Sequence, residues 1–232
     1  MSAKTFSALL AGALLITLAG CSSPAPEVSS APSSSAPAPE ETPEAEASLP
    51  VLSDDELGAI FTDLQFVPDQ FASTGELMDS IYPGLAASDL SCLAPFGVGW
   101  DSDTALVSAS LEYGTSNDRS MTAVVASTGD ADAASTLVSD AKDAIARCAE
   151  GADIFEMQGK TVSTTVEETT PTLTGTDEAI GWTVTGTVGG SPFTLVGLTA
   201  RVGGNVVALV GWDPSTNETY VPLATQMFVD AL

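Results

Sequence analysis

The sequence contains no histidine, and this absence excludes several functions at once. Without an imidazole there is no Ser-His-Asp or Cys-His catalysis, no histidine zinc site and no histidine-ligated haem. Basic residues are also scarce, since 6 Lys and Arg stand against 31 Asp and Glu and the net charge is -25. Because binding phosphate groups takes clusters of Lys and Arg, we expect no nucleic-acid partner and no docking on anionic lipid headgroups.

Motifs that carry known chemistries are missing as well. The chain has no nucleophile elbow, phosphate-binding loop or dinucleotide fingerprint. Two carboxylate pairs, Asp101 with Asp103 and Asp130 with Asp132, have the spacing of a calcium loop, but neither has glycine at the sixth position. We therefore expect helix capping or a solvated loop at both pairs, and predict no enzyme, no metal site and no cofactor.

The N-terminus predicts export and a lipid anchor. Lys4 precedes an apolar run that starts at Phe6 and ends at Leu18. At about 14 residues, this run is shorter than the roughly 20 that a membrane-spanning helix needs. It leads into Leu18-Ala19-Gly20-Cys21, which resembles a bacterial lipobox. We predict a signal peptide over residues 1–20 and lipidation of Cys21, which places the protein at the extracytoplasmic face of the cell membrane. The alternative is an ordinary secretory signal that contains a cysteine by chance.

Low-complexity sequence follows the lipobox. Residues 21–49 form a segment rich in Ser, Pro, Ala and Glu, with Val28 and Leu49 as its only larger aliphatic side chains. Such a composition buries too little apolar area to offset the entropy of ordering the chain. We predict a disordered linker that holds the domain of residues 50–232 away from the membrane.

Residues 50–232 alternate between helical and strand patterns. Helices are expected from Ser53 to a stop at Pro68 and over residues 74–82, 132–150 and 222–231. Strands are expected over residues 104–113, 121–127, 162–168, 180–188, 193–200 and 205–212. The order α-α-β-β-α-β-β-β-β-α predicts an α+β fold with a mainly antiparallel sheet of about six strands. The last two strands are apolar on both faces and should be central, whereas the Thr-rich strand at 162–168 should be an edge.

Two cysteines remain once Cys21 is assigned to the anchor. Cys92 precedes the first expected strand, and Cys148 lies near the end of the expected helix at 132–150. Exported compartments favour disulfides, so we predict a Cys92–Cys148 bridge. The alternative is two separate buried thiols.

These features together resemble a known family. The element order, the positions of Cys92 and Cys148, and the closing pair of apolar strands with a terminal helix are similar to the extracellular sensor domain of mycobacterial PknH-type kinases and related actinobacterial lipoproteins. The resemblance covers roughly residues 50–232 and is strongest around Ala141 to Glu150. It implies an antiparallel sheet with helices around a cleft, and ligand sensing instead of catalysis. Members of the family often carry two disulfides, whereas this chain has cysteines for one, and no family site residue has a counterpart here.

Small residues on the central strands suggest where such a cleft would lie. Gly197 and Ala208 would leave concave space over one face of the sheet, and Trp182 and Trp212 would form its walls. We predict that this cleft takes an apolar or amphipathic envelope molecule. The alternative is that the small residues let helices pack closely against the sheet.

Three classes of function fit these observations. The favoured class is a lipid-anchored binding or sensory-accessory domain. The second is a structural or docking lipoprotein that contacts another envelope protein and has no small-molecule ligand. The third is a carboxylate-dependent hydrolase, because hydrolysis of a glycoside needs only two carboxylates.

Replacing Cys21 tests the anchor. The Cys21→Ala variant should stay unprocessed or be released from the cell, because the thiol that would carry the lipid is gone. Cell fractionation followed by immunoblotting measures this. A variant that remains with the membranes as strongly as the unchanged protein would show that the lipobox interpretation is wrong.

Overall fold

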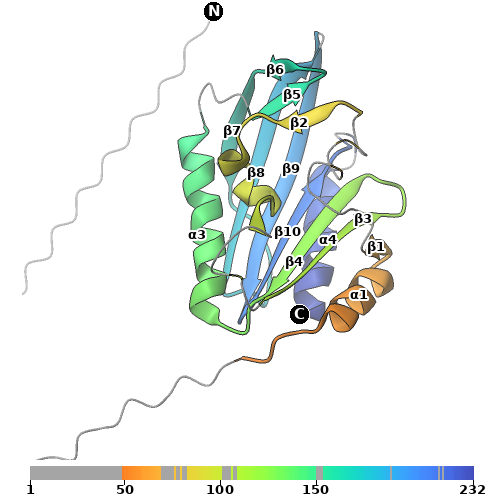
Figure 1. Cartoon of the computed structure of the whole chain (residues 1–232), viewed down its shortest axis with the longest axis vertical. Helices are drawn as coiled ribbons and strands as arrows, with labels where there is room; N and C mark the ends of the chain where they lie inside the picture. Colours follow the sequence, from red (N-terminus) through yellow and green to blue (C-terminus); the bar gives the residue numbers. More distant parts are fainter. Residues whose placement is uncertain are drawn as a thin grey trace, which may run out of the picture. The chain divides into compact units, whose positions relative to one another are not determined.

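The structure is a computed structural model that describes residues 49–68, 76, 79, 83–100, 106, 109–149, 154–188, 190–213, 215 and 217–232. It contains a seven-stranded sheet, a three-stranded sheet and flanking helices, and every strand pairing is antiparallel (Figure 1). The predicted α+β class is confirmed. The predicted signal peptide, Cys21 and nearly all of the linker lie outside the described residues.

The large sheet contains six strands that correspond to the expected ones and one more. The strand expected over 104–113 is displaced, since it begins at Ser110, ends at Ser116 and leaves Leu106 outside it. In spatial order its strands are β1 (Phe66–Pro68), β3 (Ser110–Ser116), β4 (Met121–Ser127), β10 (Asn205–Gly211), β9 (Ser191–Val202), β8 (Glu178–Val188) and β7 (Thr164–Thr169). Strand β10 lies in the middle and is buried along its whole length, with β9 beside it, as their apolar patterns predicted. The Thr-rich strand β7 is an edge, also as predicted.

Helices cover both faces of this sheet. Helix α3 (Ala131–Arg147) and the 3₁₀ helix η1 (Leu90–Phe96) lie on one face, and α1 (Asp54–Asp63) and α4 (Asn217–Ala231) lie on the other (Figure 1). Alternate residues of β10 therefore enter different cores. Ala208 packs with the core beneath α3, whereas Val207 and Leu209 pack with the core beneath α1 and α4. A strand with two covered faces must be apolar on both.

The helix ends follow local chemistry. The predicted capping box of α1 is present, since Ser53 and Glu56 exchange hydrogen bonds between side chain and backbone. This helix ends at Asp63, ahead of Pro68, and Gln65 then has a left-handed φ of 66°, so the chain re-enters the sheet as β1. The carboxylate of Asp130 caps α3, as expected for that acidic pair.

The C-terminal helix begins earlier than expected. Helix α4 starts at Asn217 and continues through Pro222, which removes one backbone donor without ending the helix. Most of the helix expected at 74–82 lies outside the described residues, although Glu76 and Asp79 have helical conformation.

The three-stranded sheet was not predicted. It consists of β2 (Leu85–Ala87), β5 (Phe155–Met157) and β6 (Lys160–Val162), in the order β2-β5-β6. Strands β5 and β6 form a hairpin whose two turn residues, Gln158 and Gly159, both have left-handed φ values of 53° and 72°. Positive φ at both positions is the mark of a type I′ turn, which matches the twist of the flanking strands.

Two glycines in the large sheet lie opposite aromatic residues. In the register of β8 and β9, Gly197 pairs with Trp182, and Gly186 pairs with Phe193. A Cβ atom added at Gly197 would overlap the indole ring of Trp182, and one added at Gly186 would overlap the ring of Phe193. Each aromatic ring therefore fills the space that its cross-strand glycine leaves free.

This packing makes Gly197 intolerant of a side chain. The Gly197→Ala variant should lose about 3 kcal/mol of unfolding free energy, because its methyl group enters space that Trp182 already fills. The matched control is Gly58→Ala in α1, where an added Cβ meets nothing within 4 Å and should stabilise by about 0.5–1 kcal/mol. Denaturant unfolding measures both variants. Equal stability of Gly197→Ala and the unchanged protein would contradict the packing described here.

Candidate functional site

An apolar cavity of about 340 Å³ lies between the small sheet and the end of the β8–β9 hairpin. The small sheet, the hairpin and the end of β10 supply its walls. The residues lining it are Leu85, Phe155, Met157, Val162, Val188, Ser191, Pro192, Phe193, Leu195 and Trp212. Among these residues Ser191 alone has an aliphatic hydroxyl, and none carries a charge. The cavity is therefore suited to an apolar group.

The register of the small sheet explains why its side chains line this cavity. Leu85 is paired with Met157, and Phe155 with Val162, and residues directly opposite in an antiparallel pair project from the same face. These four side chains thus form one apolar face. Phe155 also packs edge-on against Phe193, with ring centroids 6.5 Å apart, so the small sheet contacts the hairpin directly.

Trp212 presents its apolar ring surface to the cavity. Its indole nitrogen Nε1 donates a hydrogen bond of 3.0 Å to Oγ1 of Thr122, inside the protein. Because Thr122 already accepts this hydrogen bond, a ligand can contact the indole of Trp212 without providing an acceptor.

The structure places the four residues of the predicted cleft differently. Trp212 lines the cavity, whereas Trp182, Gly197 and Ala208 lie in the packed core and do not line it. Trp182 is 0% exposed, and its ring packs against that of Phe96 at a centroid distance of 4.2 Å, with the ring planes tilted by 35°. The space predicted over Gly197 is filled by Trp182 itself, which corrects the prediction of a hollow there.

Sequence reasoning missed the part of the cavity built by the small sheet. Its strands have three residues each, too few for an alternating pattern to stand out. A signal was present around Gln158-Gly159, where Phe155 and Met157 precede the turn and Val162 follows it at alternating positions. A two-residue turn ending in glycine between such residues indicates a hairpin.

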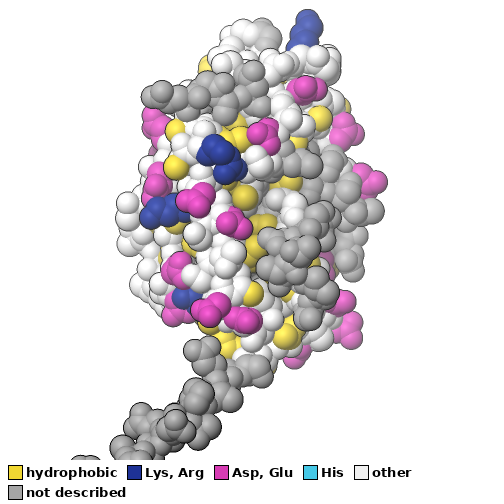
Figure 2. All heavy atoms as spheres, turned by 60° about the vertical axis from the view of Figure 1, so that its left-hand side comes forward, with side chains coloured by type: hydrophobic (Ala, Val, Ile, Leu, Met, Phe, Trp, Pro, Cys, Tyr) yellow, Lys and Arg dark blue, Asp and Glu magenta, His cyan; other side chains and the backbone are white. Residues whose placement is uncertain are grey.

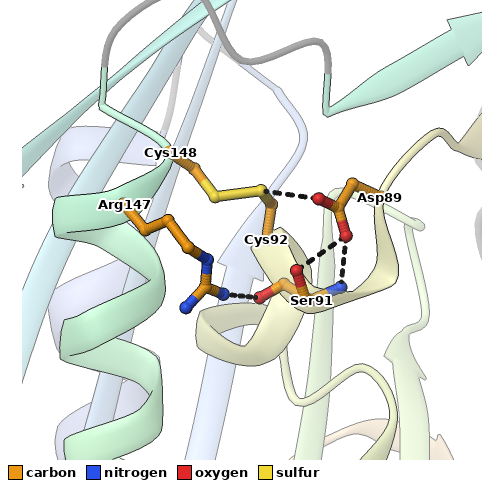
Figure 3. Close-up of a disulfide and its surroundings, with 5 residues drawn as sticks. All are labelled: Asp89, Ser91, Cys92, Arg147 and Cys148. Atoms are coloured by element: carbon orange, nitrogen blue, oxygen red, sulfur yellow. Dashed lines mark hydrogen bonds between the residues drawn. A yellow bond between two sulfur atoms is a disulfide. The ribbon is translucent and has the colours of Figure 1, made fainter.

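A disulfide holds η1 against the end of α3 (Figure 3). Cys92 in η1 is bonded to Cys148, the C-cap residue of α3, with 5.9 Å between their Cα atoms. The predicted bridge is confirmed. Beside it, Nη2 of Arg147 donates a hydrogen bond of 2.8 Å to the carbonyl oxygen of Ser91. Helix η1 is thus tied to α3 by one covalent bond and one charge-assisted hydrogen bond.

Asp89 caps η1 at the same junction. Its carboxylate accepts hydrogen bonds from the hydroxyl of Ser91 at 2.7 Å and from the backbone N–H of Ser91 at 2.9 Å (Figure 3). These two bonds hold the pKa of Asp89 below its ordinary value, and the Arg147 guanidinium adds to the effect. The capped helix carries Phe96, which also packs edge-on against Phe155 of the cavity wall at 5.8 Å.

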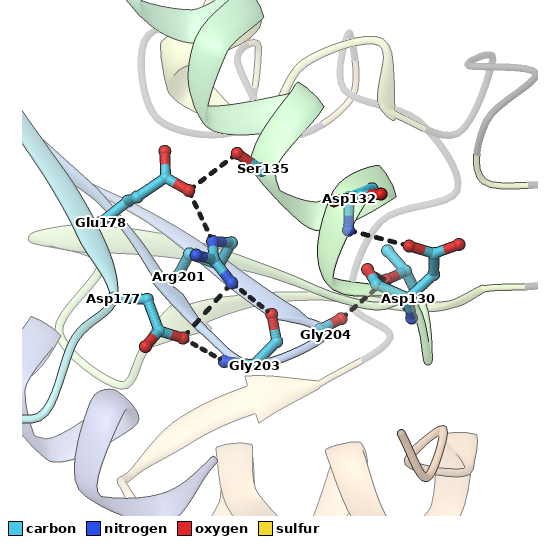
Figure 4. Close-up of polar contacts among 9 residues, drawn as sticks. Asp130, Asp132, Ser135, Asp177, Glu178, Arg201, Gly203 and Gly204 are labelled. Atoms are coloured by element: carbon cyan, nitrogen blue, oxygen red, sulfur yellow. Dashed lines mark hydrogen bonds and ion pairs between the residues drawn. The ribbon is translucent and has the colours of Figure 1, made fainter. Parts of the chain in front are cut away.

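A second polar cluster fastens the other end of β9 (Figure 4). Arg201 forms ion pairs with Asp177 at 3.3 Å and with Glu178 at 2.8 Å. Glu178 also accepts a hydrogen bond from Ser135 of α3, and Asp177 accepts one from the backbone of Gly203 in the β9–β10 turn. The cluster joins three segments through satisfied bonds, so we interpret it as structural.

The remaining charges are spread over the surface. Figure 2 shows acidic side chains at many separate points of the visible face, with few basic ones among them. In the part of the chain that the structure describes, no group of three or more His, Cys, Asp or Glu residues is placed to hold a metal ion. None of its helices is long and apolar enough to cross a membrane. The pair Asp101 and Asp103 lies outside the described residues.

Comparison with known proteins gives a weak structural likeness. No family model and no curated protein matches the sequence. Among solved structures, the chain is similar to the extracellular domain of PknH from Mycobacterium tuberculosis, with 12% identity and a TM-score of 0.47 over 78% of this chain and 93% of that one. At this level the similarity is a weak one of fold, and it carries no argument about ligand or activity.

Removing the Cys92–Cys148 disulfide should destabilise the domain. The bridge spans 56 residues, so replacing both cysteines (Cys92→Ser with Cys148→Ser) should cost about 2–5 kcal/mol of unfolding free energy. Denaturant unfolding with and without reductant supplies the control, because reductant should weaken the unchanged protein and leave the double variant unaffected. Alkylation of both thiols in exported, unreduced protein would contradict the bridge.

Proposed function

We propose that this protein is an exported lipoprotein, anchored through Cys21 to the extracytoplasmic face of the cell membrane, whose domain binds an apolar or amphipathic molecule. The observation that carries the proposal is the cavity between the small sheet and the β8–β9 hairpin. Its volume of about 340 Å³ falls within the range of small-molecule sites, roughly 300–1,000 Å³. Such sites are mostly apolar with few polar groups, which describes this lining.

Other features support an extracytoplasmic binding role over a catalytic one. The Cys92–Cys148 disulfide fits an oxidising compartment. The hydrolase alternative needs two carboxylates, and none is present among the described residues that line the cavity. A domain that binds without reacting and follows a lipid anchor suits a sensory-accessory protein that presents or detects an envelope molecule.

The docking alternative is favoured by a different surface. Tyr220, Leu223 and Met227 of α4 are 53%, 58% and 50% exposed, and their spacing places them along one side of the helix. Exposed apolar side chains in a row are typical of a protein contact. Stoichiometric recovery of another envelope protein, unchanged when the cavity is filled, would favour this second function.

Filling the cavity tests the binding proposal. The Val188→Trp variant places an indole in the cavity and should abolish binding of an apolar fluorescent dye, and native mass spectrometry should show that any co-purified lipid is lost. The matched control is Val67→Trp on β1, where the native valine is 38% exposed and lies outside the cavity. The control should bind the dye as the unchanged protein does. Failure of the unchanged protein to bind any apolar probe would overturn the proposal.

A further inference from the structure

We propose that the cavity takes a single-chain amphipath with an anionic head, a carboxylate or a phosphate, and that Lys160 at the edge of the small sheet binds this head. The inference rests on the proposed function and specifies the chemical class of its ligand. Its basis is the position of Lys160 in the hairpin that forms one wall of the cavity.

The strand register puts Lys160 on the cavity side of the small sheet. Met157 pairs with Leu85 on one side and with Lys160 on the other, so the three side chains form a row on one face. Leu85 and Met157 line the cavity. Lys160 is the outermost member of this row and is exposed, next to the lining residues Met157 and Val162. A lysine in this position can lay its aliphatic stem along the apolar wall and bring its ammonium group to the rim.

The charges around the hairpin favour an anion at this point. Glu156, the acidic residue of the hairpin, pairs with Thr161 and projects from the opposite face. In the part of the chain that the structure describes, Lys160 forms no hydrogen bond and no ion pair. Arg147 and Arg201, by contrast, are engaged in the disulfide junction and in the ion-pair cluster. A cation on the cavity face is therefore available to a ligand.

The net charge of -25 would oppose an anionic ligand at long range. At physiological ionic strength, however, charges are screened beyond about 8 Å, so the groups at the mouth decide which head is preferred. Among the described residues that line the cavity none carries a negative charge, although the chain has 31 acidic residues. A cavity with apolar walls and the side chain of Lys160 on the same face of the small sheet matches an apolar chain that ends in a negative charge.

The size of the cavity limits the ligand to one chain. At about 340 Å³ it lies near the lower end of known ligand sites, which begin at roughly 300 Å³. Fatty acids and single-chain phospholipids share the required chemistry, because both join one acyl chain to an anionic head. A two-chain phospholipid would leave its second chain outside.

Binding can be followed through Trp212, which lines the cavity. The exported full-length protein is held in phosphatidylcholine nanodiscs, so that no detergent fills the cavity. It is titrated, below micelle-forming concentrations, with brominated ligands of equal chain length: a fatty acid, its methyl ester, a single-chain alkyl phosphate and a trimethylammonium analogue. Bromine near the indole quenches its fluorescence, and the Trp212→Phe variant shows how much of the signal comes from the cavity.

The unchanged protein should bind the fatty acid or the alkyl phosphate about three- to tenfold more tightly than the neutral ester, and the cationic analogue most weakly. The Lys160→Gln variant should lose this preference while still binding the ester, and Lys160→Glu should favour the cation. The matched control is Lys142→Gln on α3, which changes the net charge equally at an exposed position outside the cavity lining. It should keep the preference for anions.

The outcomes separate this inference from the function on which it rests. If the ester binds as tightly as both anions, or if Lys160→Gln and Lys142→Gln behave alike, the role of Lys160 is wrong while the cavity still binds chains. If no ligand quenches Trp212 in the unchanged protein, the proposed function itself fails. If the alkyl phosphate binds more tightly than the fatty acid, the ligand class is a single-chain phospholipid. The reverse order indicates a fatty acid.

Discussion

The contact between Trp182 and the bare backbone of Gly197 supports much of this domain. The indole lies over the glycine directly opposite on β9 and there packs against Phe96 of η1. Phe96 in turn packs against Phe155, and Phe155 against Phe193, which lies over its own cross-strand glycine. A row of aromatic rings thus runs from Trp182 of β8 to the cavity wall. The wall of the cavity is therefore in continuous aromatic contact with the packed core.

The two ends of β9 are held by different forces. One end is fastened by Arg201 and its carboxylate partners, which join β8, β9 and α3 through charged hydrogen bonds. The other end carries Pro192 and Phe193 and borders the cavity, where the contacts are apolar. Apolar contacts have no fixed direction and adapt more readily to an inserted chain than ion pairs do. The placement of the cavity at this end is consistent with ligand entry there without disturbing the opposite end.

Patterns in the sequence predicted the main strands of the large sheet, its two central strands and one of its edges, because these features depend on burial. The two-sided apolar pattern of residues 205–212 placed β10 at the centre, and the Thr-rich pattern of residues 162–168 placed β7 at an edge. The predicted cleft was misplaced because of Gly197. A glycine in a sequence indicates that a side chain is missing, but it does not indicate which neighbouring side chain occupies the space. That information lies in the cross-strand register, which sets Trp182 on Gly197. The small sheet was missed because three-residue strands acquire their structure from tertiary contacts.

The 3₁₀ helix η1 has a consequence for how the protein matures. It has seven residues, contains Pro95 and gains little from its own backbone hydrogen bonds. Its place therefore depends on contacts with the rest of the domain, among them the bond from Cys92 to Cys148 and the hydrogen bond from Arg147. Disulfides form in oxidising compartments and are rare where thiols are kept reduced. A chain still in the cytoplasm therefore lacks the covalent restraint that sets Phe96 behind the cavity wall. On the proposed export route, the wall of the cavity gains this covalent restraint only after the chain has crossed the membrane.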